Sequence, residues 1–224
     1  MCQRYALPDQ RVVEREFLPA KGWWKFAARF NVGAQAYVPA IRLHEGQSEG
    51  VMMRWGLIPS WAEGKPTADE TVCVHSEHLE RSNIYRAPWL NGQRCILPIA
   101  GFYVWPMTRG KYRQPFFIRL INRSVFGVAA IWDRSVHEDD DDVIESCSVI
   151  CVAANELMTD IGHLDGEMPA ILQRRDYQTW LRGTPVAAKA VLRPYRPGWM
   201  EAYAVSPRIN SMTADDAGLI EPLH

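Results

Sequence analysis

The sequence predicts an α+β fold, in which a curved, barrel-like and mostly antiparallel β-sheet forms the core of a single domain over residues 1–224. Seven short apolar runs are bounded by Gly, Pro or Asn, as strands commonly are. Helical signals are fewer than strand signals, and the chain shows no internal repeat. Mixed strands with few helices are typical of α+β proteins.

The expected strands follow one another at short intervals. They cover residues 36–42, 51–57, 93–98, 101–105, 115–120, 125–132 and 146–153. In the last run Cys147, Val149 and Cys151 occupy alternate positions, so they share one face of the strand. We therefore interpret Cys147 and Cys151 as core residues rather than as ligands.

Helices are expected in four regions, with short loops between the elements. Residues 76–83 lead into a second helical stretch at 85–89, and Asn155 is suited to cap a helix over 155–161. A helix over 173–181 is followed by Arg182-Gly183, which favours a helix end. Residues 215–219 form a last short turn, and 63–69, 136–142 and 193–198 are expected loops.

Composition and charge exclude some classes of protein. The 224 residues are 47% hydrophobic and 23% charged, as in a globular protein, and no run of about 18 apolar residues could span a membrane. The net charge of −1 argues against strongly electrostatic nucleic-acid binding. Five of the 26 acidic residues lie at 138–142, however, which leaves 25 basic against 21 acidic residues elsewhere. The acidic run is expected to be a solvated loop.

The five cysteines predict reduced thiols. Their number is odd, no pair has the spacing of a zinc finger, and no secretory signal is evident, so we expect a cytoplasmic protein. Two histidines, His75 and His78, are three residues apart and close to Cys73. A thiol or metal site built on Cys2, Cys73, His75 and His78 is a third possibility for function, although such spacing often occurs by chance.

Cys2 carries the most specific chemical signal. Once Met1 is removed, Cys2 has a free α-amine and a thiol on adjacent carbons. This pair reacts with an aldehyde to give an imine, which the thiol closes to a thiazolidine ring. Both groups are partly nucleophilic near neutral pH, because their pKa values are about 7.7–8.0 and about 8.5. The alternative is that Cys2 is only a small apolar residue at a frayed end.

A series of local motifs extends from Cys2 through most of the chain. They are Met-Cys-x-Arg-aromatic at 1–5, Arg-Phe-Asn-Val at 29–32, Arg-Trp-Gly-Leu-Ile-Pro-Ser-Trp at 54–61, Arg-Cys-Ile-Leu-Pro at 94–98, Gly-Phe-Tyr-Val-Trp at 101–105, Gln-Pro-Phe-Phe-Ile at 114–118, Ala-Ala-Ile-Trp at 129–132, Met-Pro-Ala-Ile-Leu at 168–172 and Val-Ser at 205–206. Each motif is modest alone. Their order and spacing together resemble the SOS-response-associated peptidase family, the abasic-site processing proteins.

The resemblance implies a fold and a chemistry. Members of that family have a single domain with a β-barrel-like core, bind single-stranded DNA and its junctions with duplex, and remove their own Met1. They capture the ring-opened aldehyde of an abasic site through Cys2 as a thiazolidine, and use no metal or organic cofactor. For this chain the resemblance implies single-stranded DNA with abasic sites as the partner, and we expect a monomer without membrane contact.

Several site positions depart from the family pattern. The family's Asn-Ala-Arg-x-Glu motif corresponds to Cys73-Val-His75-Ser-Glu77, so Cys73 takes the place of the active-site Asn and His75 that of the phosphate-binding Arg. Only Glu77 is retained. Val104 replaces the Glu of Gly-Phe-Tyr-Glu-Trp, which is thought to move protons around Cys2.

The family's catalytic His has two possible counterparts. Counted back from Met-Pro at 168–169, the position holds Asp165, whereas a small insertion would let His163 supply the imidazole. His163 can act as an acid near neutral pH, and Asp165 only if burial raises its pKa. The expected catalysis is therefore weakened by these changes.

Three residues match the DNA side of the family's site: Arg4, Asn31 and Trp61. Trp61 is followed by Ala62, where the family has a second Trp, so part of the stacking surface is missing. Two hypotheses follow. The first is an abasic-site cross-linking protein acting through Cys2, and the alternative is a single-stranded DNA binding module that has lost the chemistry.

Overall fold

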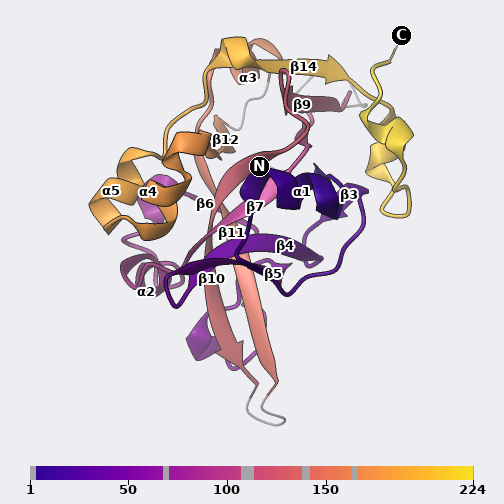
Figure 1. Cartoon of the computed structure of the whole chain (residues 1–224). Helices are drawn as coiled ribbons and strands as arrows, with labels where there is room; N and C mark the ends of the chain where they lie inside the picture. The colour runs from indigo at the N-terminus through magenta and orange to yellow at the C-terminus, as the bar shows by residue number, and fades with distance from the viewer. Residues whose placement is uncertain (1–3, 68–70, 107–113, 138–141, 163–165, 224) are drawn as a thin grey trace.

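Five strands close into a barrel at the centre of the computed structural model, which describes residues 4–67, 71–106, 114–137, 142–162 and 166–223. They are β4 (Tyr37–His44), β5 (Gln47–Trp55), β7 (Arg94–Ile99), β10 (Phe126–Val136) and β11 (Val143–Ala153). Neighbours pair antiparallel in the order β5-β4-β7-β10-β11. A parallel pairing of Ser146 with Arg54 and of Cys147 with Trp55 joins β11 to β5 and closes the ring (Figure 1).

A second sheet of five strands lies against one end of the barrel. It contains β1 (Arg4–Leu7), β3 (Arg29–Gly33), β8 (Gly101–Val104), β9 (Phe116–Leu120) and β14 (Met200–Ala204), in the order β14-β9-β8-β1-β3. The barrel strand β7 continues into β8 with only Ala100 between them. The N–H of Ala100 donates to the carbonyl of Ala6 at 2.7 Å, so the N-terminal strand is held where the two sheets meet.

Short strands spread the barrel open at this end. β6 (Cys73–His75) extends the sheet along β11 after β5 has left it, pairing Cys73 with Val149 and His75 with Cys151. On the other side of β11, β12 (Glu167–Pro169) pairs with β11 and β13 (Ile171–Leu172) pairs with β10. These strands separate β10 from β11. β2 (Lys21–Gly22) pairs in parallel with β5 at Glu49 and Gly50, along the part of β5 that does not pair with β11.

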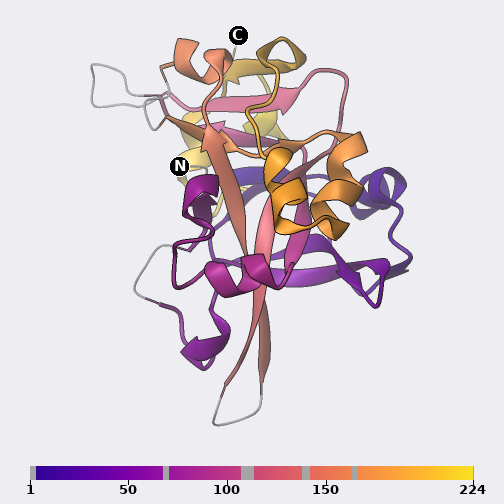
Figure 2. The same ribbon diagram turned by 90° about the vertical axis from the view of Figure 1, so that its left-hand side faces the viewer.

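At its other end the β10–β11 pair continues as a two-stranded arm beyond the barrel (Figures 1 and 2). The 3₁₀ turn η1 (Ser60–Ala62) packs on this arm, because Asp133 accepts a hydrogen bond from the N–H of Ser60 at 2.8 Å. Ser135 accepts one from Gly64, also at 2.8 Å. The acidic run expected as a loop connects the two strands of the arm, but only Asp142 of it is among the described residues.

In the described part of the chain five short helices surround the sheets, and their ends follow from local sequence. They are α1 (Gln10–Phe17), α2 (Arg86–Leu90), α3 (Glu156–Asp160), α4 (Tyr177–Arg182) and α5 (Pro185–Ala190). Asn155 caps α3 as expected, since its side chain accepts from the N–H of Met158 at 3.1 Å. Gly183 ends α4, as expected, and Thr184 caps α5, in which Pro185 takes the first position. Among the described residues no helix is long and apolar enough to cross a membrane.

Further single turns complete the chain. These 3₁₀ turns are η2 (Ser76–His78), η3 (Arg174–Asp176), η4 (Pro197–Trp199), η5 (Pro207–Asn210) and η6 (Ala217–Ile220). η4 leads directly into β14, and η5 and η6 belong to a C-terminal segment that follows β14 and lies beside β3 (Figure 1). Together the barrel, the second sheet and the helices confirm the expected single-domain α+β fold.

The seven expected strands are all present, with bounds shifted by a few residues. The helix expected over 76–83 is wrong, because residues 76–78 form a single 3₁₀ turn and the following residues form turns rather than a helix. There the Ser82 hydroxyl accepts from the N–H of Ile84 at 3.2 Å, a local bond that competes with helix formation. The shared face of Cys147, Val149 and Cys151 is buried as expected, but so is the opposite face, where Ser148 contacts Tyr85.

Candidate functional site

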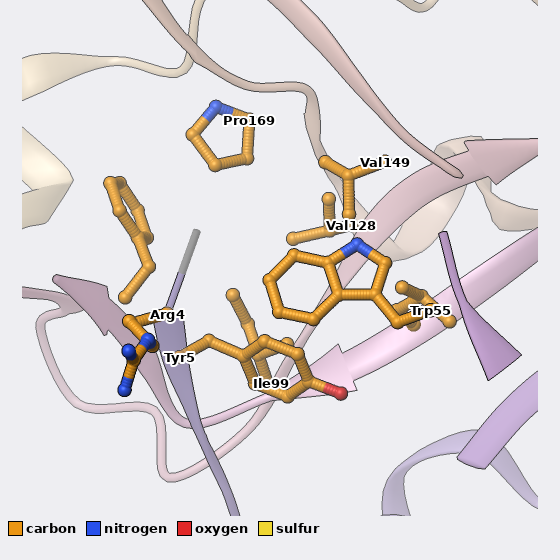
Figure 3. A pocket seen from close by; sticks show the side chains of 9 residues that line it. Arg4, Tyr5, Trp55, Ile99, Val128, Val149 and Pro169 are labelled. Carbon is orange, nitrogen blue, oxygen red and sulfur yellow. The ribbon is translucent and has the colours of Figure 1, made fainter. Parts of the chain in front are cut away.

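A small hollow opens at the spread end of the barrel, between β1 and the ends of β10 and β11 (Figure 3). Its volume is about 20 Å³, which is room for about one water molecule. The hollow itself therefore admits nothing larger than a water molecule. The hollow is lined by Arg4, Tyr5, Trp55, Leu97, Ile99, Phe102, Val128, Val149 and Pro169.

Arg4 is the one charged residue of this lining. A guanidinium nitrogen donates to Oδ1 of Asn31 at 2.7 Å, and another contacts Sδ of Met212. Partial burial lowers the pKa of Arg4 from its ordinary value, yet an arginine stays charged at neutral pH. Arg4 is thus a fixed positive charge at the mouth of the hollow.

Asn31 is buried and fully engaged. Its Nδ2 donates to the carbonyls of Ser211 at 2.9 Å and Ala214 at 2.8 Å, while its backbone N–H donates to Asp215 at 3.0 Å. With a side chain only 4% exposed and used in this way, Asn31 holds the C-terminal segment against Arg4. The sequence gives no sign of Met212 and Asp215 in this role, because both lie about 180 residues further along the chain.

Cys73 lies beside the hollow. It is the first residue of β6 and pairs with Val149, which lines the hollow. The preceding carbonyl, of Val72, accepts a hydrogen bond from the indole of Trp55 at 2.8 Å, and Trp55 also lines the hollow. The Cys73 thiol is buried. Cys2 lies outside the described residues, so the structure gives no distance between Cys2 and Cys73.

His75 ends the same strand, two residues further from the barrel. Its Nδ1 accepts from the N–H of Glu77 at 3.4 Å, and its ring centroid lies 6.0 Å from that of His78. The two imidazoles are thus neighbours on one turn. Among the described residues, however, no group of three or more His, Cys, Asp or Glu side chains is arranged to hold a metal ion.

Val104 is the last residue of β8 and pairs with Phe116. Its side chain is buried, two residues along the strand from Phe102 of the hollow. A valine has no group that titrates or donates a proton. Any proton transfer at this end of the barrel must therefore come from another residue.

Cys2, His163 and Asp165 lie outside the described residues, but the chain on either side of them is placed. Cys2 is two residues before Arg4, a distance of at most about 7 Å along the chain. A Cβ built on Gly162, next to His163, would lie 3.7 Å from Pro106, close to the end of β8. Pro169, four residues after Asp165, lines the hollow.

Trp61 lies elsewhere. Its side chain is 60% exposed on η1, which packs on β10 at Asp133. Asp133 is five residues from Val128 of the hollow, or roughly 17 Å along the strand. The expected DNA-side residues therefore form two groups, with Arg4 and Asn31 in contact and Trp61 on the side of the arm.

These features define a class of protein. It has a five-stranded barrel, and one end of this barrel brings together Arg4 on the N-terminal strand with Cys73 and Val104, which take the places of active-site residues in the family named above. The family model for SOS response associated peptidase (SRAP) matches residues 1–212. The chain belongs to this family.

Curated relatives match along most of the chain. The abasic site processing protein YoqW of Bacillus subtilis (strain 168) is 29% identical over 99% of this chain and 99% of its own length. The abasic site processing protein YoaM of the same organism is 30% identical over 99% of this chain and 98% of its own length. The abasic site processing protein HMCES of Gallus gallus is 27% identical over 89% of this chain and 67% of its own length.

Solved structures share the fold. A crystal structure of a protein from Bacteroides thetaiotaomicron has a TM-score of 0.88 at 22% identity, and covers 100% of both chains. One from Bordetella bronchiseptica has a TM-score of 0.78 at 23% identity, and covers 92% of this chain and 100% of its own. At these identities the likeness extends to the fold alone.

Proposed function

We propose that this protein processes abasic sites in single-stranded DNA by covalent capture through Cys2. The observation that carries the proposal is the convergence at one end of the barrel. Arg4, two residues after Cys2, lines the same hollow as the strand partner of Cys73 and as Pro169. Val104 lies two residues from that lining. Curated relatives over nearly the whole chain are named abasic site processing proteins.

The capture begins with loss of Met1 by hydrolysis, which frees the α-amine of Cys2. This amine adds to the aldehyde carbon of the ring-opened abasic sugar, and the resulting carbinolamine loses water to give an imine. The Cys2 sulfur then bonds to the imine carbon, while the thiol proton moves to the nitrogen. One water leaves overall, and the product is a thiazolidine that joins the protein to DNA.

Arg4 has the properties of a phosphate ligand for the captured strand. Its guanidinium is positive and oriented by Asn31 at 2.7 Å. The hollow behind it holds only about 20 Å³, so it admits neither a base nor a sugar. The strand would therefore pass over the mouth, with its phosphate on Arg4 and the aldehyde directed to Cys2.

Proton transfer is the weak part of this site. Imine formation requires a neutral amine, and loss of water requires an acid; such assistance is worth roughly 10²–10⁴-fold in rate. Val104 provides neither, so His163 or Asp165 would have to supply the acid. We expect capture to be slow rather than absent.

A second function, single-stranded DNA binding without covalent capture, is favoured by the residues at positions 104 and 73. Val104 is buried and Cys73 replaces an amide, so in this second function the chain retains the binding surface without the chemistry. In that case Arg4 and Trp61 serve a single-stranded DNA binding module.

One experiment separates the two functions. Purified protein with Cys2 as its first residue is incubated with a single-stranded abasic oligonucleotide, and the products are examined on a denaturing gel and by mass spectrometry. We expect an adduct with the mass of protein plus DNA minus one water. An intact oligonucleotide and Cys2→Ser should both give none. Binding on a native gel without any adduct over hours would instead establish the binding module.

A further inference from the structure

A second, larger hollow lies away from Arg4, at the opposite end of the β9 strand from Val104. Its volume is about 390 Å³, within the range of about 300–1,000 Å³ typical of ligand pockets. Val104 pairs with Phe116, whereas this hollow begins at Leu120, four residues or about 13 Å further along β9. It is lined by Leu120, Ile121, Asn122, Arg123, Tyr195, Gly198 and Trp199.

Trp199 gives this hollow an aromatic wall. Its side chain is 49% exposed, although its backbone carbonyl is fixed by a hydrogen bond from the N–H of Ile121 at 3.0 Å. The buried ring of Tyr195 meets the indole nearly edge-on, with centroids 6.1 Å apart. The guanidinium of Arg196 lies over the indole, so the opposite face of this half-exposed ring is the one on which a planar ring can stack.

More arginine than carboxylate side chains lie around Trp199. The guanidinium of Arg196 lies 5.2 Å from the indole centroid of Trp199, and Arg123 lines the hollow itself. Arg123 and Arg174 share one carboxylate, that of Glu16, at 3.5 Å and 3.3 Å. The surroundings are thus positive, which complements an anionic ligand.

Asn122 adds a polar edge at the turn between β9 and the following segment. Its backbone has φ of 59°, a left-handed conformation that asparagine tolerates better than most residues. The side-chain amide can both donate and accept hydrogen bonds. An aromatic face, a cation and an amide therefore meet in one hollow, over an apolar floor formed by Leu120 and Ile121.

We propose that this hollow binds a nucleotide, with the base stacked on Trp199 and the phosphate on Arg123. Asn122 would contact the polar edge of the base. The same chemistry is found in a free mononucleotide and in one unit of a single-stranded DNA, so both are sources to be tested. The site needs nothing from Cys2 and can be examined in a Cys2→Ser background, where failure of covalent capture has no effect on the result.

Gly198 allows a matched test of the charge. A Cβ added there meets no atom within 4 Å, so a side chain at this position extends into open space. Gly198→Asp and Gly198→Asn have nearly the same shape and differ by one charge. We expect Gly198→Asp to weaken binding of thymidine monophosphate by about tenfold and Gly198→Asn to leave it near the wild-type value. Binding of uncharged thymidine should not distinguish the two variants.

Trp199→Ala tests the stacking face, with Trp23→Ala as a control because Trp23 is another exposed tryptophan, at 70%. Equilibrium dialysis with thymidine monophosphate and fluorescence anisotropy with a labelled oligothymidylate test the two sources. Loss of about tenfold or more in Trp199→Ala but not in Trp23→Ala, for either ligand, supports the proposal. Absence of saturable binding of both ligands to the parent protein, or binding by Trp199→Ala and Gly198→Asp that equals binding by the parent protein, overturns it.

Discussion

Asn31 and Arg4 form a contact that links the two ends of the chain. Oδ1 of Asn31 accepts from the guanidinium of Arg4 at 2.7 Å, and Nδ2 of the same side chain donates to carbonyls at 211 and 214. The oxygen of this side-chain amide thus contacts β1, while its nitrogen contacts the C-terminal segment. The position of Arg4 beside the hollow consequently depends on residues far from it in sequence.

We predict that Asn31→Ala lowers both stability and DNA affinity. The substitution removes the donor from the part-buried carbonyls of Ser211 and Ala214, and loss of a typical hydrogen bond costs roughly 0.5–1.5 kcal/mol, so the free energy of unfolding in urea should fall by about that amount for each bond. Arg4 loses the acceptor that orients it, so the dependence of DNA binding on salt should become shallower. Met212→Leu, which leaves the amide intact, is the control. If Asn31→Ala binds DNA with unchanged affinity and salt slope, Asn31 does not position Arg4.

Trp61→Ala should weaken DNA binding without destabilising the fold. The indole is 60% exposed, so its removal leaves little cavity, while base stacking on an aromatic is worth roughly 1–3 kcal/mol. Affinity for single-stranded DNA at fixed salt should drop about tenfold, with no change in the urea midpoint. Trp23→Ala is matched in exposure and should bind normally. Equal affinities for the two variants would remove Trp61 from the binding surface.

The fold could be predicted from the sequence because strand signals are local. Each of the seven expected strands is an apolar run with a turn residue at its boundary. The sequence does not reveal α1 or the last strand, β14, as clearly. β14 pairs only with β9 at the edge of its sheet, and four of its five residues are only partly buried, so its apolar pattern is weak.

The candidate site was predictable only where motif and chemistry coincide in sequence. The family's motifs identify Arg4 and Cys73, whereas Met212 and Asp215 contact the site through tertiary packing alone. The same motifs associate Trp61 with Arg4, yet the fold places η1 on the arm. Spacing along a chain does not determine distance across a barrel.

We predict that Val104→Glu increases the rate of cross-linking but lowers stability at high pH. The new carboxylate would supply the missing acid–base group, which is worth roughly 10²–10⁴-fold. Val104 is buried, so burial should raise the pKa of the new carboxyl. A folded-state pKa above the unfolded one means that stability is retained at low pH and is lost as pH rises above about 4.3.

Val104→Gln provides the uncharged control for this substitution. Between pH 5 and pH 8 the free energy of unfolding, measured in urea, should decrease more for Val104→Glu than for Val104→Gln. Cross-linking time courses on folded protein should be faster for Glu alone. Identical time courses for Glu, Gln and wild type would mean that position 104 is not the missing component.

Cys147 should be silent toward thiol reagents and should make the protein sensitive to alkali. Burial raises the pKa of its thiol to about 12. Because this is above the unfolded value of about 8.5, the thiol contributes stability below pH 8.5 that is lost as pH rises toward 12, at about 1.4 kcal/mol per unit. Unfolding free energies at pH 8 and pH 10 should therefore differ less in Cys147→Ala than in wild type. Rapid labelling of Cys147 in native protein at pH 8 would contradict its burial.

Removal of Met1 should switch this protein between its two proposed functions. While Met1 is attached, the nitrogen of Cys2 is an amide and cannot form an imine, so the thiol can give only a reversible hemithioacetal with an aldehyde. Protein made with Cys2 as its first residue should give an adduct that survives denaturant, and the Met1 form should give none. Both forms should bind intact single-stranded DNA equally, which controls for folding. In the processed form, His163→Ala should slow capture if His163 is the acid, and Asp165→Ala should do so if Asp165 is. An adduct from the Met1 form that is stable in denaturant and retains Met1 would rule out thiazolidine capture, because no free amine would have been present to form it.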